Sequence, residues 1–188
     1  QILRDGMPLF EGFSGGFGIL QIPPLDLKQI ELIKGSASTL YGGGAIGGLI
    51  NLISKKPTYD QEAEVTLNET TLKESNANTY LAKRNKHFGY NFFGGYSHQG
   101  IVDVNKDELS DVPKNKAVIV HPRLFFYPGG KSTVSIGYTG TFEDRIGGDM
   151  LAVDGKSDAL HRYFEKDKMQ RHTADLQSQF IINDENHI

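Results

Sequence analysis

The stretch IELIKGSASTLYGGGAIGGLINLISKKP, residues 30–57, decides the fold of this chain. Short apolar runs rich in β-branched residues lie near its two ends, at 30–33 and 49–53, and their length and composition predict two strands. Between them Ser36 can cap one helical turn over 37–41, which the following glycines end. The stretch therefore predicts a strand, a single helical turn, tight glycine bends and a second strand.

Three glycines of this stretch, Gly42, Gly44 and Gly47, spell the pattern G-x-G-x-x-G. A dinucleotide fingerprint needs a strand before these glycines and a helix that opens on them, so that helix N–H groups meet the pyrophosphate. The expected order here is reversed, because a helical turn precedes the glycines and a strand follows. We interpret them as bends and close-packing points, and a nucleotide-dependent enzyme is one alternative.

The same stretch resembles the closing segment of the plug domain of TonB-dependent outer-membrane receptors. The family pattern I-E-x-x-K-G-x-x-S-x-x-Y-G-x-G-A-x-G-G-x-I-N-x-I-[ST]-K runs through it almost unbroken, and Ser36 stands where the family often has proline. A D-G-x-P-L element, matched here at 5–9, precedes that segment in the family. We expect structural roles for what we call the plug signature, namely Glu31, Lys34, Gly35, Tyr41, Gly42, Gly44, Gly47, Gly48 and Asn51.

The resemblance implies a mainly β chain, a fragment of a plugged transmembrane antiparallel β-barrel that is preceded by the α/β end of a plug domain. Residues 1–58 would be the C-terminal part of the plug, and residues 59–188 about the first six barrel strands. Both chain ends look like cuts in a longer protein.

The implied function is TonB-dependent uptake of a scarce nutrient, most often a ferric siderophore, across the outer membrane of a Gram-negative bacterium. The expected partners are the inner-membrane TonB complex (through a segment absent here), the nutrient and membrane lipid. No catalysis and no cofactor are implied.

The composition of the chain argues against several classes of function. A net charge of −3 and a pI near 6.1 argue against a strongly basic nucleic-acid binder. The absence of cysteine excludes disulfides, thiolate zinc sites and a cysteine nucleophile. The spacing of the six histidines fits no zinc-enzyme motif. No apolar run approaches the ~18 residues of a transmembrane helix. This length criterion does not detect membrane-spanning β-strands, because their apolar and polar residues alternate.

After about residue 58 the hydrophobic pattern has period two, most clearly over 133–143 and 117–127. Several runs reach the roughly 9 to 11 residues that a tilted membrane strand needs, whereas strands of soluble sandwiches are usually nearer about 5 or 6. Polar side chains, Arg123 among them, occupy the second face, as expected for a hydrated lumen. A soluble β-rich binding or adhesion module is an alternative that explains the alternation but not the plug signature.

The connections between these strands differ in length. Those at 84–87 and 128–131 are tight, and those at 99–115 and 145–168 are long and polar; the short loop near 73–76 is an exception to this alternation. Bacterial barrels place short turns in the periplasm and long loops outside, so the long connections are expected to be extracellular.

Two loop motifs resemble known sites only in part. The sequence GGKST at 129–133 resembles the end of a phosphate-binding loop, but a strand is expected after it, which favours a hairpin turn. The run that starts at Asp103 opens like a calcium loop, but Glu108 and Lys114 occupy positions that need glycine and glutamate, which excludes an EF-hand. A looser oxygen site from Asp103, Asn105, Asp107 and Asp111 stays open, with solvated loop charges as the alternative.

Before the signature, residues 2–9 read as two short strands around an Asp-Gly turn, and residues 25–29 as a helical turn. Between them lies a glycine-rich loop with three phenylalanines. Because plug loops at this place help to hold the cargo in the family, the resemblance implies a ligand-facing loop; the alternative is that the rings pack in the core. The candidate ligand-binding residues are Phe10, Phe13, Phe17 and Gln21 of this loop, and His161 of the last long connection.

Overall fold

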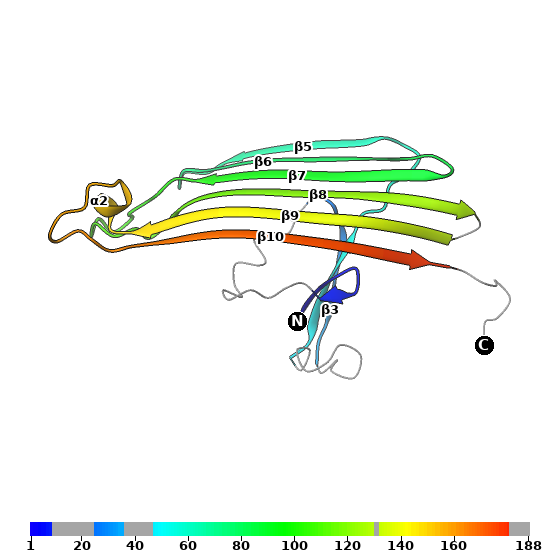
Figure 1. Ribbon diagram of the computed structural model, residues 1–188, viewed down its shortest axis with the longest axis horizontal. Helices are drawn as coiled ribbons and strands as arrows, with labels where there is room; N and C mark the ends of the chain where they lie inside the picture. The colour runs from blue at the N-terminus through cyan, green and yellow to red at the C-terminus, as the bar shows by residue number, and fades with distance from the viewer. Residues whose placement is uncertain (9–24, 36–46, 130–131, 181–188) are drawn as a thin grey trace. The chain divides into compact units, whose positions relative to one another are not determined.

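The computed structural model describes residues 1–8, 25–35, 47–129 and 132–180, and it divides into two compact units, Gln1–Lys56 and Pro57–Ile188. Each unit is built on one sheet (Figure 1). We describe the two units separately.

The first unit is a four-stranded mixed sheet in the order β2-β1-β4-β3. Its strands are β1 (Ile2–Arg4), β2 (Met7–Pro8), β3 (Leu27–Ile33) and β4 (Leu49–Ser54). The predicted hairpin at the start of the chain is confirmed, because β1 and β2 pair antiparallel. Its two turn residues, Asp5 and Gly6, have φ values of 50° and 81°, as the twist of a two-residue hairpin requires.

The expected helical turn at 25–29 is wrong. Strand β3 begins at Leu27 and pairs antiparallel with β4 from Leu27 opposite Ser54 to Ile33 opposite Leu49, with a register shift between Leu27 and Gln29. Pairing with β4 satisfies the backbone groups of this polar segment, which has no apolar periodicity of its own to favour a helix. The helical turn expected at 37–41 lies outside the described residues.

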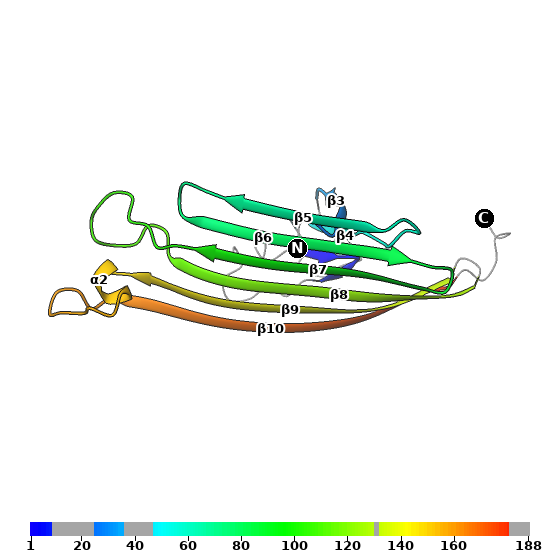
Figure 2. The ribbon, with the colours of Figure 1, turned by 90° about the horizontal axis from the view of Figure 1, so that it is seen from above.

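The second unit is a six-stranded antiparallel sheet in which every strand pairs with its neighbours in sequence, as Figure 2 shows. Its strands are β5 (Glu62–Glu69), β6 (Glu74–Arg84), β7 (Phe88–Gln99), β8 (Lys114–Gly129), β9 (Ser132–Gly148) and β10 (Phe164–Gln179). The last three strands have 16, 17 and 16 residues, far longer than most strands of soluble sheets.

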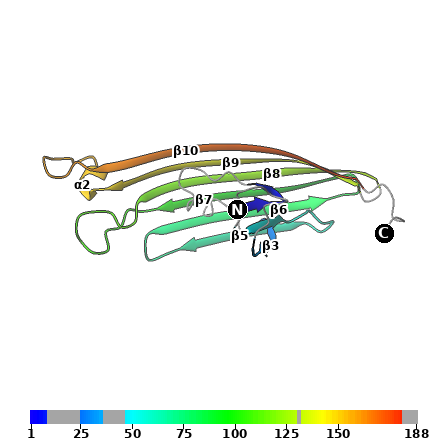
Figure 3. The same ribbon diagram turned by 90° about the horizontal axis from the view of Figure 1, so that it is seen from below.

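The two long connections are shorter than the sequence predicted, because β8 begins at Lys114, β9 continues to Gly148 and β10 begins at Phe164. Both lie at the same end of the sheet (Figure 3). The second one contains a short helix, α2 (Met150–Val153), that was not predicted. The Asp149 side chain caps it by accepting hydrogen bonds from Leu151 N and Ala152 N at 2.9 and 3.2 Å. Among the residues that the structure describes, no helix could cross a membrane.

The two faces of this sheet confirm the predicted alternation of apolar and polar side chains. One face, which we call the apolar face, exposes large side chains such as Tyr96, Leu124, Ile136 and Leu176. The polar face carries the intervening residues, and the largest of them are buried. They include Tyr80, Asn91, Phe93, His121, Arg123, Phe125, Ser135 and Thr141.

Candidate functional site

The plug signature contributes a hydrogen-bonded chain across the first sheet. Asn51 on β4 donates through Nδ2 to Glu31 Oε2 on β3 at 2.9 Å, and its Oδ1 accepts from the backbone N of Gly6 at 3.0 Å. One side-chain amide therefore joins β4 to β3 on one side and to the β1–β2 turn on the other. Glu31 and Asn51 thus have a structural explanation, whereas Lys34 is exposed.

Two signature glycines occupy backbone conformations that disfavour other residues. Gly35 has φ +89°, and Gly48 has φ +103°; a Cβ on Gly48 would lie 2.6 Å from the carbonyl oxygen of Ile33. Gly47, in contrast, has open space around it. Tyr41, Gly42 and Gly44 lie outside the described residues.

A buried ion pair that sequence reasoning missed joins the start of this unit to the turn before β3. Arg4 on β1 pairs with Asp26, and the side chain of Asp26 is only 3% exposed. Arg4 also donates through Nε to Ser54 Oγ at 3.1 Å, while the Ser54 backbone N donates to Asp5 Oδ1 at 2.9 Å. An arginine at the end of a short, otherwise apolar strand was the available signal, but its partner is 22 residues away.

Of the predicted ligand-binding residues, Phe10, Phe13, Phe17 and Gln21 lie outside the described residues. The structure places His161 between the two long connections. Its Nδ1 lies 2.9 Å from Asp158 Oδ1 and its Nε2 lies 3.1 Å from Glu108 Oε2. His161 thus links the loop after β9 to the loop after β7, with both ring nitrogens engaged.

The charges around His161 shift two pKa values. Hydrogen bonds to Asp158 and Glu108 raise the pKa of His161, because they favour the imidazolium. The pKa of Asp158 falls to about 2, because its carboxylate accepts hydrogen bonds from the backbone and side chain of His161 and from the backbone of Leu160.

The acidic residues of the loop after β7 hold its backbone. Asp103 accepts from the N–H groups of Lys106 and Glu108 at 2.6 and 3.0 Å, and Asp111 accepts from that of Val104 at 2.7 Å. Within the described ranges, no three His, Asp or Glu side chains are grouped to hold a metal ion. These carboxylates act as turn caps in this structure.

The polar face of the second sheet holds a buried arginine. Arg123 Nη2 on β8 lies 3.8 Å from Asp175 Oδ1 and 3.4 Å from Gln177 Oε1, both on β10. Gly137 on the intervening β9 leaves the room for this contact, because a Cβ there would lie 2.3 Å from Asp175 Oδ2. The arginine that was predicted to face away from the apolar side does so.

A second arginine fixes the start of the unit to the sheet. The guanidinium carbon of Arg84 lies 3.6 Å from the ring centroid of Tyr127 and 4.8 Å from that of Tyr59. Stacking of a guanidinium between two aromatic rings is favourable. Tyr59 precedes β5, so this sandwich ties the segment before the first long strand to β6 and β8.

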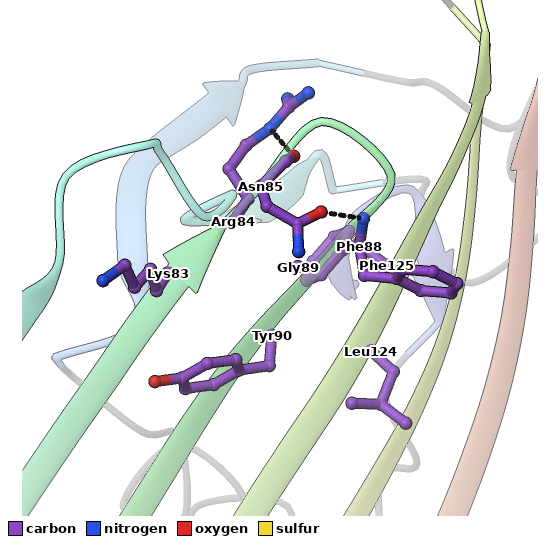
Figure 4. A pocket seen from close by; sticks show the side chains of 8 residues that line it. All are labelled: Lys83, Arg84, Asn85, Phe88, Gly89, Tyr90, Leu124 and Phe125. Carbon is purple, nitrogen blue, oxygen red and sulfur yellow. Dashed lines mark hydrogen bonds between the residues drawn. The ribbon is translucent and has the colours of Figure 1, made fainter.

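The apolar face carries a shallow groove of about 330 Å³ near the β6–β7 turn (Figure 4). Aromatic and aliphatic side chains form its walls, and Lys83 stands at its edge. Such a groove suits an alkyl chain and has too few polar groups to orient a polar ligand. It is lined by Lys83, Arg84, Asn85, Phe88, Gly89, Tyr90, Leu124 and Phe125.

A sheet of long antiparallel strands with one exposed apolar face and one polar face is the architecture of outer-membrane β-barrel proteins. Comparison of this chain with known proteins points to one family within this class. Residues 1–49 match the TonB-dependent receptor plug domain. The chain is thus similar to TonB-dependent receptors of the outer membrane, with a plug domain at residues 1–49 followed by β-strands that match receptor structures.

Three relatives illustrate the match. The ferrioxamine receptor of Yersinia enterocolitica is 28% identical over 127 residues, covering 66% of this chain and 16% of the relative. The vitamin B12 transporter BtuB of Photobacterium profundum is 37% identical over 65 residues, covering 35% of this chain and 11% of the relative. The crystal structure of the siderophore receptor PirA of Acinetobacter baumannii superimposes with a TM-score of 0.64 at 23% identity, covering 85% of this chain and 26% of that one.

This chain therefore spans less than a third of each of these three relatives. The soluble β-rich module does not account for the plug match, and neither does the nucleotide-dependent enzyme.

Proposed function

We propose that this chain is part of an outer-membrane receptor for TonB-dependent uptake of a scarce nutrient, and that the nutrient is a ferric siderophore. The observation that carries the proposal is the direct succession of a plug domain and long two-faced antiparallel strands. A ferrioxamine receptor and a siderophore receptor among the relatives described above support the siderophore, although a third relative is a vitamin B12 transporter.

We assign residues 1–58 to the C-terminal part of the plug and residues 59–188 to the first barrel strands. The two compact units and the extent of the plug match support this division. The plug signature would then act structurally, through the Glu31–Asn51–Gly6 chain and through Gly48, whose positive φ and close approach to Ile33 require glycine.

Strand order sets the orientation of the proposed receptor. Since bacterial barrels place long loops outside, the connections after β7 and β9 would be extracellular, and the β6–β7 and β8–β9 turns periplasmic. Uptake would depend on the TonB complex of the inner membrane acting on the plug, and the nutrient would be captured from the side of the long loops.

Growth on defined iron sources tests the proposal. A strain that lacks the full-length gene receives iron as single ferric siderophores or as haem, and the gene is then restored on a plasmid. We expect the deletion strain to lose growth on one siderophore. The restored gene should recover this growth in a strain that has TonB, and it should not recover it in a strain that lacks TonB. Normal growth of the deletion strain on every siderophore would contradict the siderophore assignment.

The phenylalanine loop is a separate part of the proposal. We expect the Phe13→Ala, Phe17→Ala double variant of the full receptor to bind the siderophore about tenfold more weakly, because each ring would contribute apolar contact. Phe88→Ala, on the apolar face of the sheet, is the control and should leave affinity unchanged. Equal affinity of both variants and the wild type would remove these phenylalanines from the binding site.

A further inference from the structure

Four lysines stand together on the apolar face at the end of the sheet that carries the long connections. Lys116 on β8 and Lys168 on β10 both lie opposite Asp144 on β9, so the three form one row across the strands. Lys114 and Lys166 form the next row and flank Ile146 in the same way. All four lysines are exposed, and we call them the lysine patch.

The patch carries a concentrated positive charge. On this face of the described parts of β8, β9 and β10, Asp144 is the one acidic residue, and its Oδ1 lies 3.7 Å from Lys166 Nζ. Four lysines and one aspartate leave a net charge of +3. Glu143, the acid next to Asp144, belongs to the polar face, where it pairs with Arg145 at 2.7 Å.

The position of the patch relates it to the surface of a membrane. Toward the middle of the strands the same face continues directly with Val118 on β8 and Phe142 on β9, which lie opposite each other. On β8 the lysines thus begin where the apolar band ends, on the side of the long connections, whereas on β10 Gln170 and His172 separate Lys168 from Ala174 and Leu176. Long lysine side chains at such a boundary keep their ammonium groups in the headgroup layer.

The spacing of the lysines suits anionic groups. Neighbouring strands lie about 4.8 Å apart, so lysines on β8 and β10 are about 10 Å apart across the strands. Phosphate groups placed between such lysines can accept hydrogen bonds from several ammonium groups at once. Clustered lysines next to an apolar membrane band are a recognised way to attract anionic lipid headgroups.

We propose that the lysine patch binds a lipid whose headgroup carries phosphate, in the membrane leaflet on the side of the long connections. The acyl chains of this lipid would lie along the apolar band that includes Val118 and Phe142, while its phosphates meet Lys116 and Lys168. The proposal rests on the proposed function, which puts the apolar face in a membrane. A soluble acidic protein matches the charge of the patch but leaves the adjoining apolar band unexplained.

The test uses the full-length receptor in a neutral detergent and measures lipid binding by native mass spectrometry. The probes are bisphosphorylated lipid A, its dephosphorylated form and phosphatidylcholine. The test variant is Lys116→Gln, Lys168→Gln. The control, Lys28→Gln, Lys86→Gln, removes the same charge at two exposed lysines outside the patch.

We expect the wild type to prefer the bisphosphorylated lipid, and the preference to weaken as salt is raised. The test variant should bind this lipid about tenfold more weakly, and the control should bind as the wild type does. An equal affinity of the wild type for all three lipids, or an equal loss in both variants, would overturn the proposal. The salt series on the wild type decides the question even if the test variant fails to fold.

Failure of this inference is distinguishable from failure of the proposed function. A wild-type receptor that supports growth on a siderophore but shows no preference for phosphate overturns the lysine patch alone. A receptor that supports uptake of no nutrient overturns the proposed function, whatever lipid it binds.

Discussion

Two adjacent glycines of the plug signature are under different constraints. Gly48 combines φ +103° with a close approach to the Ile33 carbonyl, whereas Gly47 meets nothing within 4 Å. We expect Gly48→Ala to destabilise the pairing of β3 and β4 by about 1–3 kcal/mol, because alanine is strained at this φ and its Cβ collides with backbone. Hydrogen exchange at the Leu49 amide in the full receptor measures the effect.

Gly47→Ala is the matched control for this prediction. It adds the same methyl group one residue earlier and should change stability by less than about 0.5 kcal/mol. If both variants exchange at the same rate, the positive φ of Gly48 is not what requires glycine there.

The buried pair of Arg4 and Asp26 gives a second prediction for a single residue. Asp26→Ala leaves a largely buried guanidinium without its carboxylate, and breaking a buried pair in this way costs about 3–5 kcal/mol. We expect amides of β1 and β4 to exchange at least ~100-fold faster in the full receptor. Lys28→Ala, an exposed change two residues later, should leave the exchange rates unaltered.

His161 should make the contact between the long loops depend on pH. Because the pKa of His161 is raised in the folded loops, its stabilising effect is complete below its unfolded pKa and is lost as pH rises through the folded value. Asp158 acts in the opposite direction. Its pKa is lowered to about 2, so its contribution is present above its ordinary pKa and is lost as pH falls toward 2.

The link should therefore be strongest in mildly acidic solution, between about pH 4 and 6.5. Hydrogen exchange in residues 158–163 should slow in this window and speed up above it. Glu108→Gln should bring the pKa of His161 closer to its ordinary value, since one of the groups that raise it loses its charge. A pH profile that is the same in His161→Gln would show that other groups control these loops.

At the scale of one strand, the two faces of β10 predict opposite responses to the same substitution. Ala174 lies on the apolar face opposite Tyr138, and Thr173, its neighbour, lies on the polar face; both are exposed. Ala174→Arg should destabilise the receptor in vesicles by about 2–4 kcal/mol, the usual cost of arginine on the lipid face near the midplane.

Thr173→Arg provides the control for this prediction. The same side chain on the polar face should cost much less, because that face is expected to be hydrated. Urea titration of the full receptor folded into phospholipid vesicles measures both variants. A similar loss in the two would mean that the apolar face of β10 does not meet lipid.

The strands of the second unit were predictable because the alternation of apolar and polar residues is a local property of the sequence. The same alternation showed that Arg123 lies on the polar face. Prediction failed at Leu27, where β3 forms because β4 is available to pair with it, and pairing between distant segments leaves no local pattern. The sandwich of Arg84 between Tyr59 and Tyr127 and the contact of His161 with Glu108 likewise depend on residues far apart in sequence. The ligand-binding phenylalanines are still a prediction.

At the scale of the whole molecule, the mixed sheet of the first unit determines how this unit responds to mechanical force. Strand β1 runs parallel to β4 and is held by Ile50 N donating to Gln1 O and Asp5 N donating to Leu52 O, both at 2.9 Å. A pull on the chain ahead of Ile2, resisted by the chain after Ser54, loads these parallel strands in shear. All their hydrogen bonds then bear the load together and must rupture together, whereas antiparallel neighbours joined by a hairpin would unzip bond by bond. This central pair of strands should resist traction, so a steady pull would extend other parts of the unit first.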